Sequence, residues 1–170
     1  MMKAVSSPTE RAPWAIRCTG SPEPSSTGAR GGAGARGGVV RRRRVAHLHL
    51  GFAQHLGVRL LHSNCPDLQV LADAQRLQQV LSNLLSNALK FSPAQGEVRL
   101  YSELAGQSVR ILVSDQGLGI PADFTARIFK KFSQADASDS RQKGGTGLGL
   151  AISKELIERM GGTIGFVSGP

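Results

Sequence analysis

The fold is decided by one stretch, Lys143-Gly144-Gly145-Thr146-Gly147-Leu148-Gly149-Leu150-Ala151-Ile152-Ser153-Lys154. Its glycines and threonine stand directly before an apolar pattern that predicts a helix over 147–160, which Gly161-Gly162 would end. Glycine lets backbone N–H groups approach a ligand closely, and a helix N-terminus adds unpaired N–H donors and a partial positive charge. Such a segment can hold phosphate oxygens. Taken alone, it is also typical of a flexible loop followed by a helix cap.

An aspartate leads a second glycine motif, Asp115-Gln116-Gly117-Leu118-Gly119-Ile120-Pro121. The motif follows an alternation of residues over 109–114 that predicts a half-buried strand. A carboxylate only accepts hydrogen bonds, so at the end of a strand it suits the exocyclic amine of adenine and disfavours the carbonyl that guanine carries there. An aspartate that merely opens a glycine-rich turn gives the same pattern.

The third segment is a predicted helix with Asp73 as its N-cap, and polar residues form a stripe along it. Asn83, Asn87 and Lys90 are spaced i, i+4 and i+7, so they share one helix face. An amide oxygen can ligate Mg²⁺ and an ammonium can contact phosphate, although most polar stripes are simply solvated. The apolar face of the same helix is predicted to be Leu77, Val80, Leu81, Leu84, Leu85 and Ala88.

The order of these segments, together with Ile128-Phe129-Lys130-Lys131-Phe132-Ser133-Gln134, resembles a known family. Residues 83–92, 115–121, 128–134 and 144–150 are similar to the asparagine box, first glycine box, phenylalanine box and second glycine box of bacterial sensor histidine kinases, most of all the hybrid type. This family is grouped with the gyrase, heat-shock chaperone and mismatch-repair ATPases. The resemblance covers about residues 52–170, and four boxes in order are far more specific than any single motif.

The resemblance implies an ATP-binding catalytic domain that uses Mg²⁺. Asn87 would be the Mg²⁺ ligand with Asn83 assisting near the phosphates, Lys90 would contact a phosphate, and Asp115 would recognise adenine. The remaining implied ATP-binding residues are Gly117 and Gly119 beneath the base, Phe129 and Phe132 at the hinge of a lid over about 133–143, and Gly145, Thr146, Gly147, Leu148 and Gly149 in the phosphate loop. Core packing explains the two phenylalanines equally well.

One position favours phosphoryl transfer over hydrolysis. In the hydrolytic relatives a glutamate one turn before the metal-binding asparagine activates water, and here that position is Asn83. A neutral amide cannot take a proton from water. The acceptor histidine is expected on a separate dimerisation domain, with a response regulator receiver domain downstream. His47, His49, His55 and His62 lack the family's acidic neighbour and proline, so they are interpreted as surface or packing residues and no catalytic residue is assigned. A non-catalytic ATP-binding fragment or scaffold module is the alternative.

The implied fold is α+β, a two-layer sandwich with helices on one face of a mostly antiparallel sheet. Strands are expected over 58–62, 67–72, 97–102, 108–114 and 163–168. The family's last strand is expected to be missing, which would leave 163–168 as an exposed edge. The ATP-binding domain is assigned to residues 47–170 and expected to be C-terminally truncated.

Residues 1–46 are interpreted as a disordered leader rich in Gly, Arg, Pro and Ser. They carry nine Lys or Arg against two Asp or Glu, whereas residues 47–170 carry twelve against ten, so most of the net charge of +9 lies in this leader. Four interpretations of this segment are open: an Arg-Gly arm for nucleic acid, a targeting presequence, an unstructured tail, and a mis-started or frame-shifted stretch. The last two are favoured, so no nucleic-acid partner is expected.

Cysteine usage and hydropathy complete the expectations. Cys18 and Cys65 fit no metal-binding spacing and suit a reducing compartment, so a cytoplasmic location is expected. No stretch approaches about 20 consecutive apolar residues, so no membrane-spanning segment is expected in this chain.

Overall fold

A five-stranded sheet forms one layer of the molecule. The computed structural model describes residues 13–19, 42–62, 72–106, 108–133 and 146–168. The strand order is β2-β3-β4-β1-β5, and every neighbouring pair is antiparallel except β2 and β3, which are parallel. The strands are β1 (Pro13–Thr19), β2 (Arg59–His62), β3 (Glu97–Ala105), β4 (Ser108–Ser114) and β5 (Thr163–Phe166).

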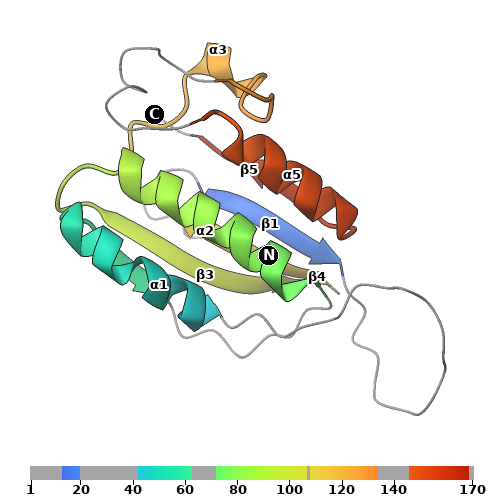
Figure 1. Cartoon of the computed structure of the whole chain (residues 1–170), viewed down its shortest axis with the longest axis horizontal. Helices are drawn as coiled ribbons and strands as arrows, with labels where there is room; N and C mark the ends of the chain where they lie inside the picture. Colours follow the sequence, from blue (N-terminus) through green and yellow to red (C-terminus); the bar gives the residue numbers. More distant parts are fainter. Residues whose placement is uncertain (1–12, 20–41, 63–71, 107, 134–145, 169–170) are drawn as a thin grey trace, which may run out of the picture.

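Three helices form the second layer, all on the same face of the sheet (Figure 1). They are α1 (Arg42–His55), α2 (Ala74–Phe91) and α5 (Gly149–Arg159). The helix α2 lies between the other two and contacts both of them. A short helix, α3 (Ala122–Thr125), lies apart from this layer near α5 and β5. The predicted two-layer α+β sandwich is therefore confirmed.

The central helix α2 forms because its capping and its apolar spacing agree. Asp73 Oδ1 accepts hydrogen bonds from the backbone N–H groups of Gln75 and Arg76 at 3.0 and 3.1 Å, as an N-cap should. The predicted apolar face is buried against the sheet, and Leu89 joins it. The fully buried leucines and valine on this face are the centre of the hydrophobic core: Leu77, Val80, Leu81, Leu84 and Leu85.

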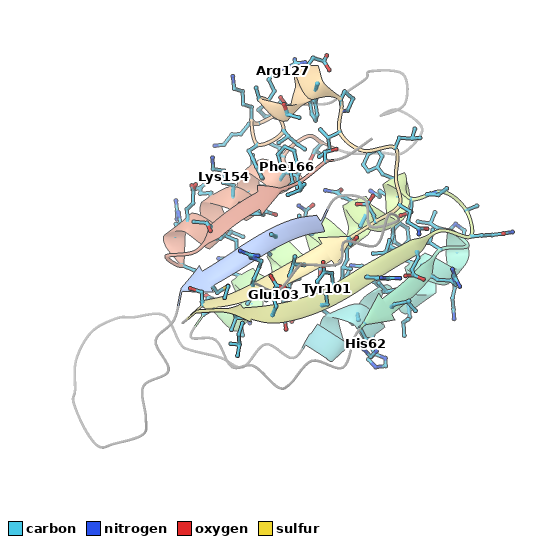
Figure 2. All side chains as sticks on the ribbon, turned by 180° about the vertical axis from the view of Figure 1, so that it is seen from behind. His62, Tyr101, Glu103, Arg127, Lys154 and Phe166 are labelled. Atoms are coloured by element: carbon cyan, nitrogen blue, oxygen red, sulfur yellow. The ribbon has the colours of Figure 1, made fainter. Side chains whose placement is uncertain are left out.

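The hairpin of β3 and β4 shows how the sheet divides its two faces. Along β3, Val98, Leu100 and Ser102 are buried beneath the helices. Tyr101 and Glu103 alternate with them and project from the other face, which Figure 2 views directly. The alternation predicted for 109–114 is not observed at the end of β4, where residues 111–114 are all buried. Gly106 provides the positive φ of +65° that the turn between the strands requires.

The first strand corrects the interpretation of residues 1–46 as a wholly disordered leader. Pro13–Thr19 pairs with β4 over seven residues and with β5 over four. Ile16 is fully buried and Cys18 is nearly so, and burial raises the pKa of the Cys18 thiol. Residues 13–19 are therefore part of the folded domain, whereas 1–12 and 20–41 lie outside the described residues.

The expected edge strand at 163–168 is observed over Thr163–Phe166, although it has one neighbour that was not expected. The observed strand is β5, which is last in the sheet order but pairs with β1 on its inner side. The N-terminal segment thus lies between β4 and β5, and β5 remains the edge strand of the sheet. The backbone groups of β5 gain hydrogen-bonding partners from β1.

The helix α1 is a second correction to the domain boundary, because it begins at Arg42 rather than after residue 46. Val45, Ala46 and Ala53 pack into the core from it. No helix was predicted here, because the segment opens with consecutive arginines and has no strong N-cap signal. Among the helices of the described residues, none is long and apolar enough to cross a membrane.

Candidate nucleotide-binding site

Helix α2 brings the two glycine motifs to one side of the molecule. A Cβ built on Gly117 would lie 2.8 Å from the backbone oxygen of Phe91, the last residue of α2. A Cβ built on Gly149, the first residue of α5, would lie 2.3 Å from Asn83 Oδ1 in the middle of α2. Both glycines are needed for these close approaches. The asparagine stripe therefore lies between the first glycine motif and the second.

Asp115 directly follows β4 and is turned back onto its own motif. Its Oδ1 accepts a hydrogen bond from the Gly117 N–H at 2.8 Å. Burial raises the pKa of the Asp115 carboxyl, and the hydrogen bond from Gly117 opposes this shift. A half-buried acceptor at a strand end agrees with the predicted role in adenine recognition, and the Asx-type turn of the alternative interpretation is also present.

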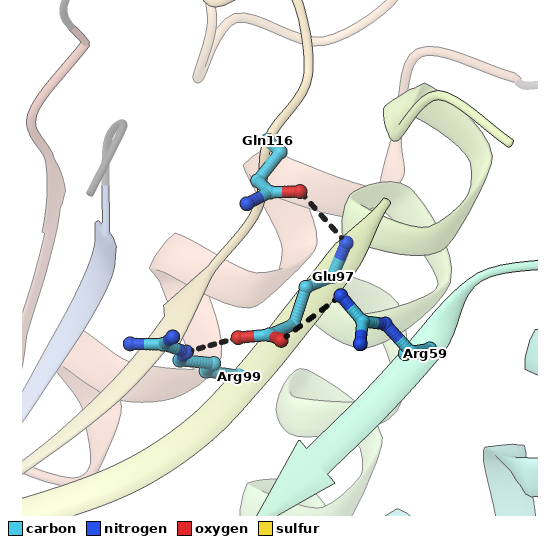
Figure 3. Close-up of polar contacts among 4 residues, drawn as sticks. All are labelled: Arg59, Glu97, Arg99 and Gln116. Atoms are coloured by element: carbon cyan, nitrogen blue, oxygen red, sulfur yellow. Dashed lines mark hydrogen bonds and ion pairs between the residues drawn. The ribbon is translucent and has the colours of Figure 1, made fainter. Parts of the chain in front are cut away.

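A polar network anchors this motif to the sheet. Gln116 Oε1 accepts from the backbone N–H of Glu97 at 3.0 Å, which ties the motif to the start of β3. The largely buried Glu97 carboxylate in turn forms ion pairs with Arg99 and, at 3.6 Å, with Arg59 of β2 (Figure 3). At the other end of the motif, the Ile120 N–H donates to Ser168 Oγ at 2.7 Å. The motif that begins with Asp115 is thus anchored by hydrogen bonds at both of its ends.

The polar stripe of α2 is half-buried at all three predicted positions, Asn83, Asn87 and Lys90. Asn83 Nδ2 donates to Ser153 Oγ of α5 at 2.9 Å, so it has a partner within the protein. Within the described part of the chain, the Asn87 side chain has no such hydrogen-bond partner, one turn further along the same face. Asn87 thus has an amide oxygen that no described protein group occupies, whereas Asn83 Oδ1 lies against Gly149.

The donor set fits Mg²⁺ held together with a nucleotide rather than by the protein alone. Among the described residues there is no cluster of three or more His, Cys, Asp or Glu side chains that could hold a metal ion. Mg²⁺ commonly takes one or two protein oxygens and completes its octahedron with water and substrate phosphates. One amide oxygen from Asn87 satisfies this requirement.

The two predicted hinge phenylalanines differ in environment. Phe129 is half-buried against the core, with its ring 6.1 Å from that of Phe166 and Lys154 Nζ 5.4 Å above it. Lys154 and Phe166, both labelled in Figure 2, thus contact the same phenylalanine ring from α5 and β5. Phe132 is 75% exposed and has a positive φ of +60°. Core packing thus describes Phe129 but not Phe132.

The backbone connects Phe132 to the second glycine motif. Its N–H donates to the Gly147 carbonyl at 3.0 Å, and a Cβ on Gly147 would meet the Phe132 backbone at 3.0 Å. Gly147 also has a φ of +67°. Thr146 is exposed, and Leu148 and Gly149 are half-buried where α5 starts. Gly145 and residues 134–143 of the predicted lid lie outside the described residues.

The sequence analysis did not identify several residues that support this site. They are Ser153, Gln116, Glu97 and Ser168, and each joins a predicted motif to another element. Of these four residues, only Ser153 has a sequence feature that could have indicated its role. It is a small polar residue on the buried side of a helix, one turn after a glycine, and a buried hydroxyl needs a partner.

Known proteins share these features. Residues 72–170 match the family described as "Histidine kinase-, DNA gyrase B-, and HSP90-like ATPase". The circadian input-output histidine kinase CikA of Synechococcus elongatus is 53% identical over 93 residues, which cover 55% of this chain and 12% of CikA. The sensor protein GacS of Pseudomonas syringae is 46% identical over 118 residues, covering 66% of this chain and 13% of GacS. The chain thus spans about one eighth of these relatives.

Solved structures agree with the sequence relatives. Full-length ShkA in complex with AMPPNP has a TM-score of 0.63 and 32% identity, and the match covers 78% of this chain and 30% of ShkA. The catalytic domain of the histidine kinase ThkA has a TM-score of 0.60 and 28% identity, over 73% of this chain and 86% of that domain.

Proposed function

Because the chain belongs to the histidine kinase-, DNA gyrase B- and HSP90-like ATPase family, we propose that it binds Mg-ATP as the catalytic domain of a sensor histidine kinase. The observation that carries the proposal is the position of α2 between the two glycine motifs. Asn83, in the middle of α2, lies against Gly149 of the second glycine motif. Phe91, at the end of α2, lies against Gly117 of the first glycine motif. A single nucleotide along this side of α2 can therefore reach all three motifs.

Each motif would hold a different part of the nucleotide. Asp115 would accept a hydrogen bond from the adenine amine, and Gly117 and Gly119 would lie beneath the base. Asn87 would ligate Mg²⁺ between the phosphates, and Lys90 would neutralise phosphate charge. The backbone from Gly145 to Gly149, with Thr146 and Leu148, would surround the terminal phosphates at the start of α5. Phe129 and Phe132 would mark the hinge of the lid.

The proposed reaction is phosphoryl transfer rather than hydrolysis. Positioning and charge neutralisation are the main contributions a protein makes to such a transfer. The position one turn before Asn87 holds the neutral amide of Asn83, which cannot act as a general base on water. The acceptor would be a histidine of a dimerisation domain, and a response regulator would receive the phosphoryl group next. One neighbour, ThkA, has been solved in complex with the response regulator TrrA.

The histidines of this chain lie away from the proposed site. His47, His49 and His55 are on α1, which Figure 1 shows on the opposite side of α2 from α5. His62 is on β2, which packs beside α1. An acceptor outside these four residues is consistent with this arrangement.

Calorimetric titration with the ATP analogue AMPPNP tests the proposal. The wild-type chain should bind it, and more tightly with Mg²⁺ than with EDTA. Asp115→Asn should weaken binding under both conditions, because the adenine contact does not involve the metal. Asn87→Ala should lower affinity about 10–100-fold with Mg²⁺, the range typical of groups that support a metal site, and change little with EDTA. Wild-type protein that is folded but does not bind AMPPNP would contradict the proposal.

A further inference from the structure

A hydrogen bond joins the two helices that border the proposed phosphate site. Asn83 Nδ2 of α2 donates to Ser153 Oγ of α5 at 2.9 Å across 70 residues of sequence. Ser153 is only 2% exposed, so water cannot replace this partner. The bond connects the segment before Asn87 to the second turn of α5.

Gly149 strengthens the contact by its small size. A Cβ at this position would lie 2.3 Å from Asn83 Oδ1, 2.9 Å from Cγ and 3.0 Å from Nδ2, far inside any permitted contact. Gly149 and Ser153 are one turn apart, so the Asn83 amide lies against two successive turns of the same face of α5. The amide thus fixes both the distance and the register between the helices.

From this geometry we infer that Asn83 is a positioning residue, with Ser153 as its partner. The inference rests on the proposed function. Asn87 lies one turn after Asn83 on α2, and the proposed phosphate loop ends at Gly149, the first residue of α5. The Asn83–Ser153 bond therefore sets the separation between the proposed Mg²⁺ ligand and the phosphate loop. This goes beyond the sequence-based expectation that Asn83 assists near the phosphates, because it gives the Asn83–Ser153 contact a role of its own.

The two roles of Asn83 predict different results for Ser153, which is the basis of the test. If Asn83 positions α5, Asn83→Ala and Ser153→Ala should each weaken Mg-AMPPNP binding by about tenfold. The double variant should be no weaker than either single variant, because one interaction is removed in all three. Adenosine, which has no phosphates, should bind all variants as it binds the wild type. Gln79→Ala, which removes an exposed amide from the same helix, should leave both affinities unchanged.

NMR spectra of the ligand-free variants provide a structural measurement beside the binding affinities. In the ligand-free protein, the amide resonances of residues 149–153 should shift in both single variants and not in Gln79→Ala. Weakened binding in Asn83→Ala alone would make Asn83 a direct ligand and overturn the inference. Lower melting temperatures with unchanged Mg-AMPPNP affinity would overturn it as well, since the bond would then serve stability only.

The failure of this inference is distinguishable from failure of the proposed function. If folded wild-type protein does not bind Mg-AMPPNP, both are wrong. If the wild type binds it and both single variants bind it equally well, only the positioning role is wrong.

Discussion

At the scale of single residues, Asp115 shows a conflict between stability and recognition. Burial disfavours its charged form, and one backbone N–H from Gly117 compensates only in part, so the net pKa is raised. The charged Asp115 carboxylate lowers the stability of the ligand-free protein. A ligand that donates a hydrogen bond to this carboxylate would explain its presence. Strained or costly groups of this kind are common at functional sites.

Asp115→Asn should therefore raise the free energy of unfolding at pH 7, although it weakens nucleotide binding. The folded protein binds the Asp115 proton more tightly than the unfolded chain does. Native stability from this group consequently falls as the pH rises from the ordinary aspartate pKa, 3.8, through the raised native value. Asparagine does not titrate, and its amide oxygen can still accept from Gly117.

Urea unfolding of both proteins between pH 3.5 and pH 8 measures this effect. The stability gained by Asp115→Asn should be largest above the raised pKa and should shrink toward zero as the pH approaches 3.8. A variant that is less stable than the wild type at pH 7 would show that the carboxylate is favoured in the free fold.

At the scale of elements, β1 is the strand that extends the folded domain beyond the boundary expected from the sequence. Its side chains Ile16 and Cys18 complete the core between β4 and β5. A strand that pairs on both sides leaves neither of its neighbours with an open inner edge. The folded domain therefore depends on residues far upstream of the region that matches the family.

Replacing Ile16 with alanine should destabilise the full chain by about 2–5 kcal/mol, the usual cost of truncating a fully buried isoleucine. Leu104→Ala is a suitable control, because Leu104 lies on β3 and is 65% exposed. This control should change the stability by no more than about 0.5 kcal/mol. Denaturant unfolding of the two variants gives both values, and equal stabilities would show that β1 does not pack in the sheet.

Elements defined by local signals were predictable from the sequence. The Asp73 cap, the period of α2, the turn at Gly106 and the stop at Gly161 all lie within or next to their elements. The strand β1 has no such signal, since its partners are β4 and β5, about 90 to 150 residues away, and it is flanked by Gly, Pro and Arg. Pairing of distant strands depends on packing that a local pattern does not contain.

The candidate site likewise has features that local sequence predicts and features that depend on the packing of distant residues. The spacing of Asn83, Asn87 and Lys90 predicted their shared face. The glycine motifs were predicted to approach a nucleotide, and the close approaches observed are to Phe91, Phe132 and Asn83 of the protein itself. The partner of Asn83 could not be predicted, because Ser153 is joined to it only by the packing of α2 on α5. The sequence therefore predicts which residues form the site better than it predicts what each residue contacts.

At the scale of the whole molecule, the arrangement of helices separates the histidines from the phosphate loop. The helix α1 packs on α2 and β2, whereas α5 packs on α2 and β5. Because α2 lies between them (Figure 1), a phosphoryl group held at the start of α5 is far from every histidine on α1.

Incubation with radiolabelled ATP and Mg²⁺ should consequently leave the four histidines of the isolated chain unlabelled. Phosphohistidine is stable in alkali and labile in acid, so the measurement is alkali-stable radioactivity in the purified protein. A fourfold variant with all four histidines replaced by glutamine is the control for background. Alkali-stable label that this variant loses would show that the chain contains its own acceptor.

The central claim is that one nucleotide contacts all three motifs, and a single NMR titration tests it. Mg-AMPPNP is added to isotope-labelled full chain while the amide resonances of Asn87, Gly117 and Gly147 are followed. If one nucleotide contacts all three motifs, the three resonances should shift along curves with the same Kd, and the Asn87 shift should require Mg²⁺. Three different dissociation constants, or a shift confined to one motif in folded protein, would contradict it.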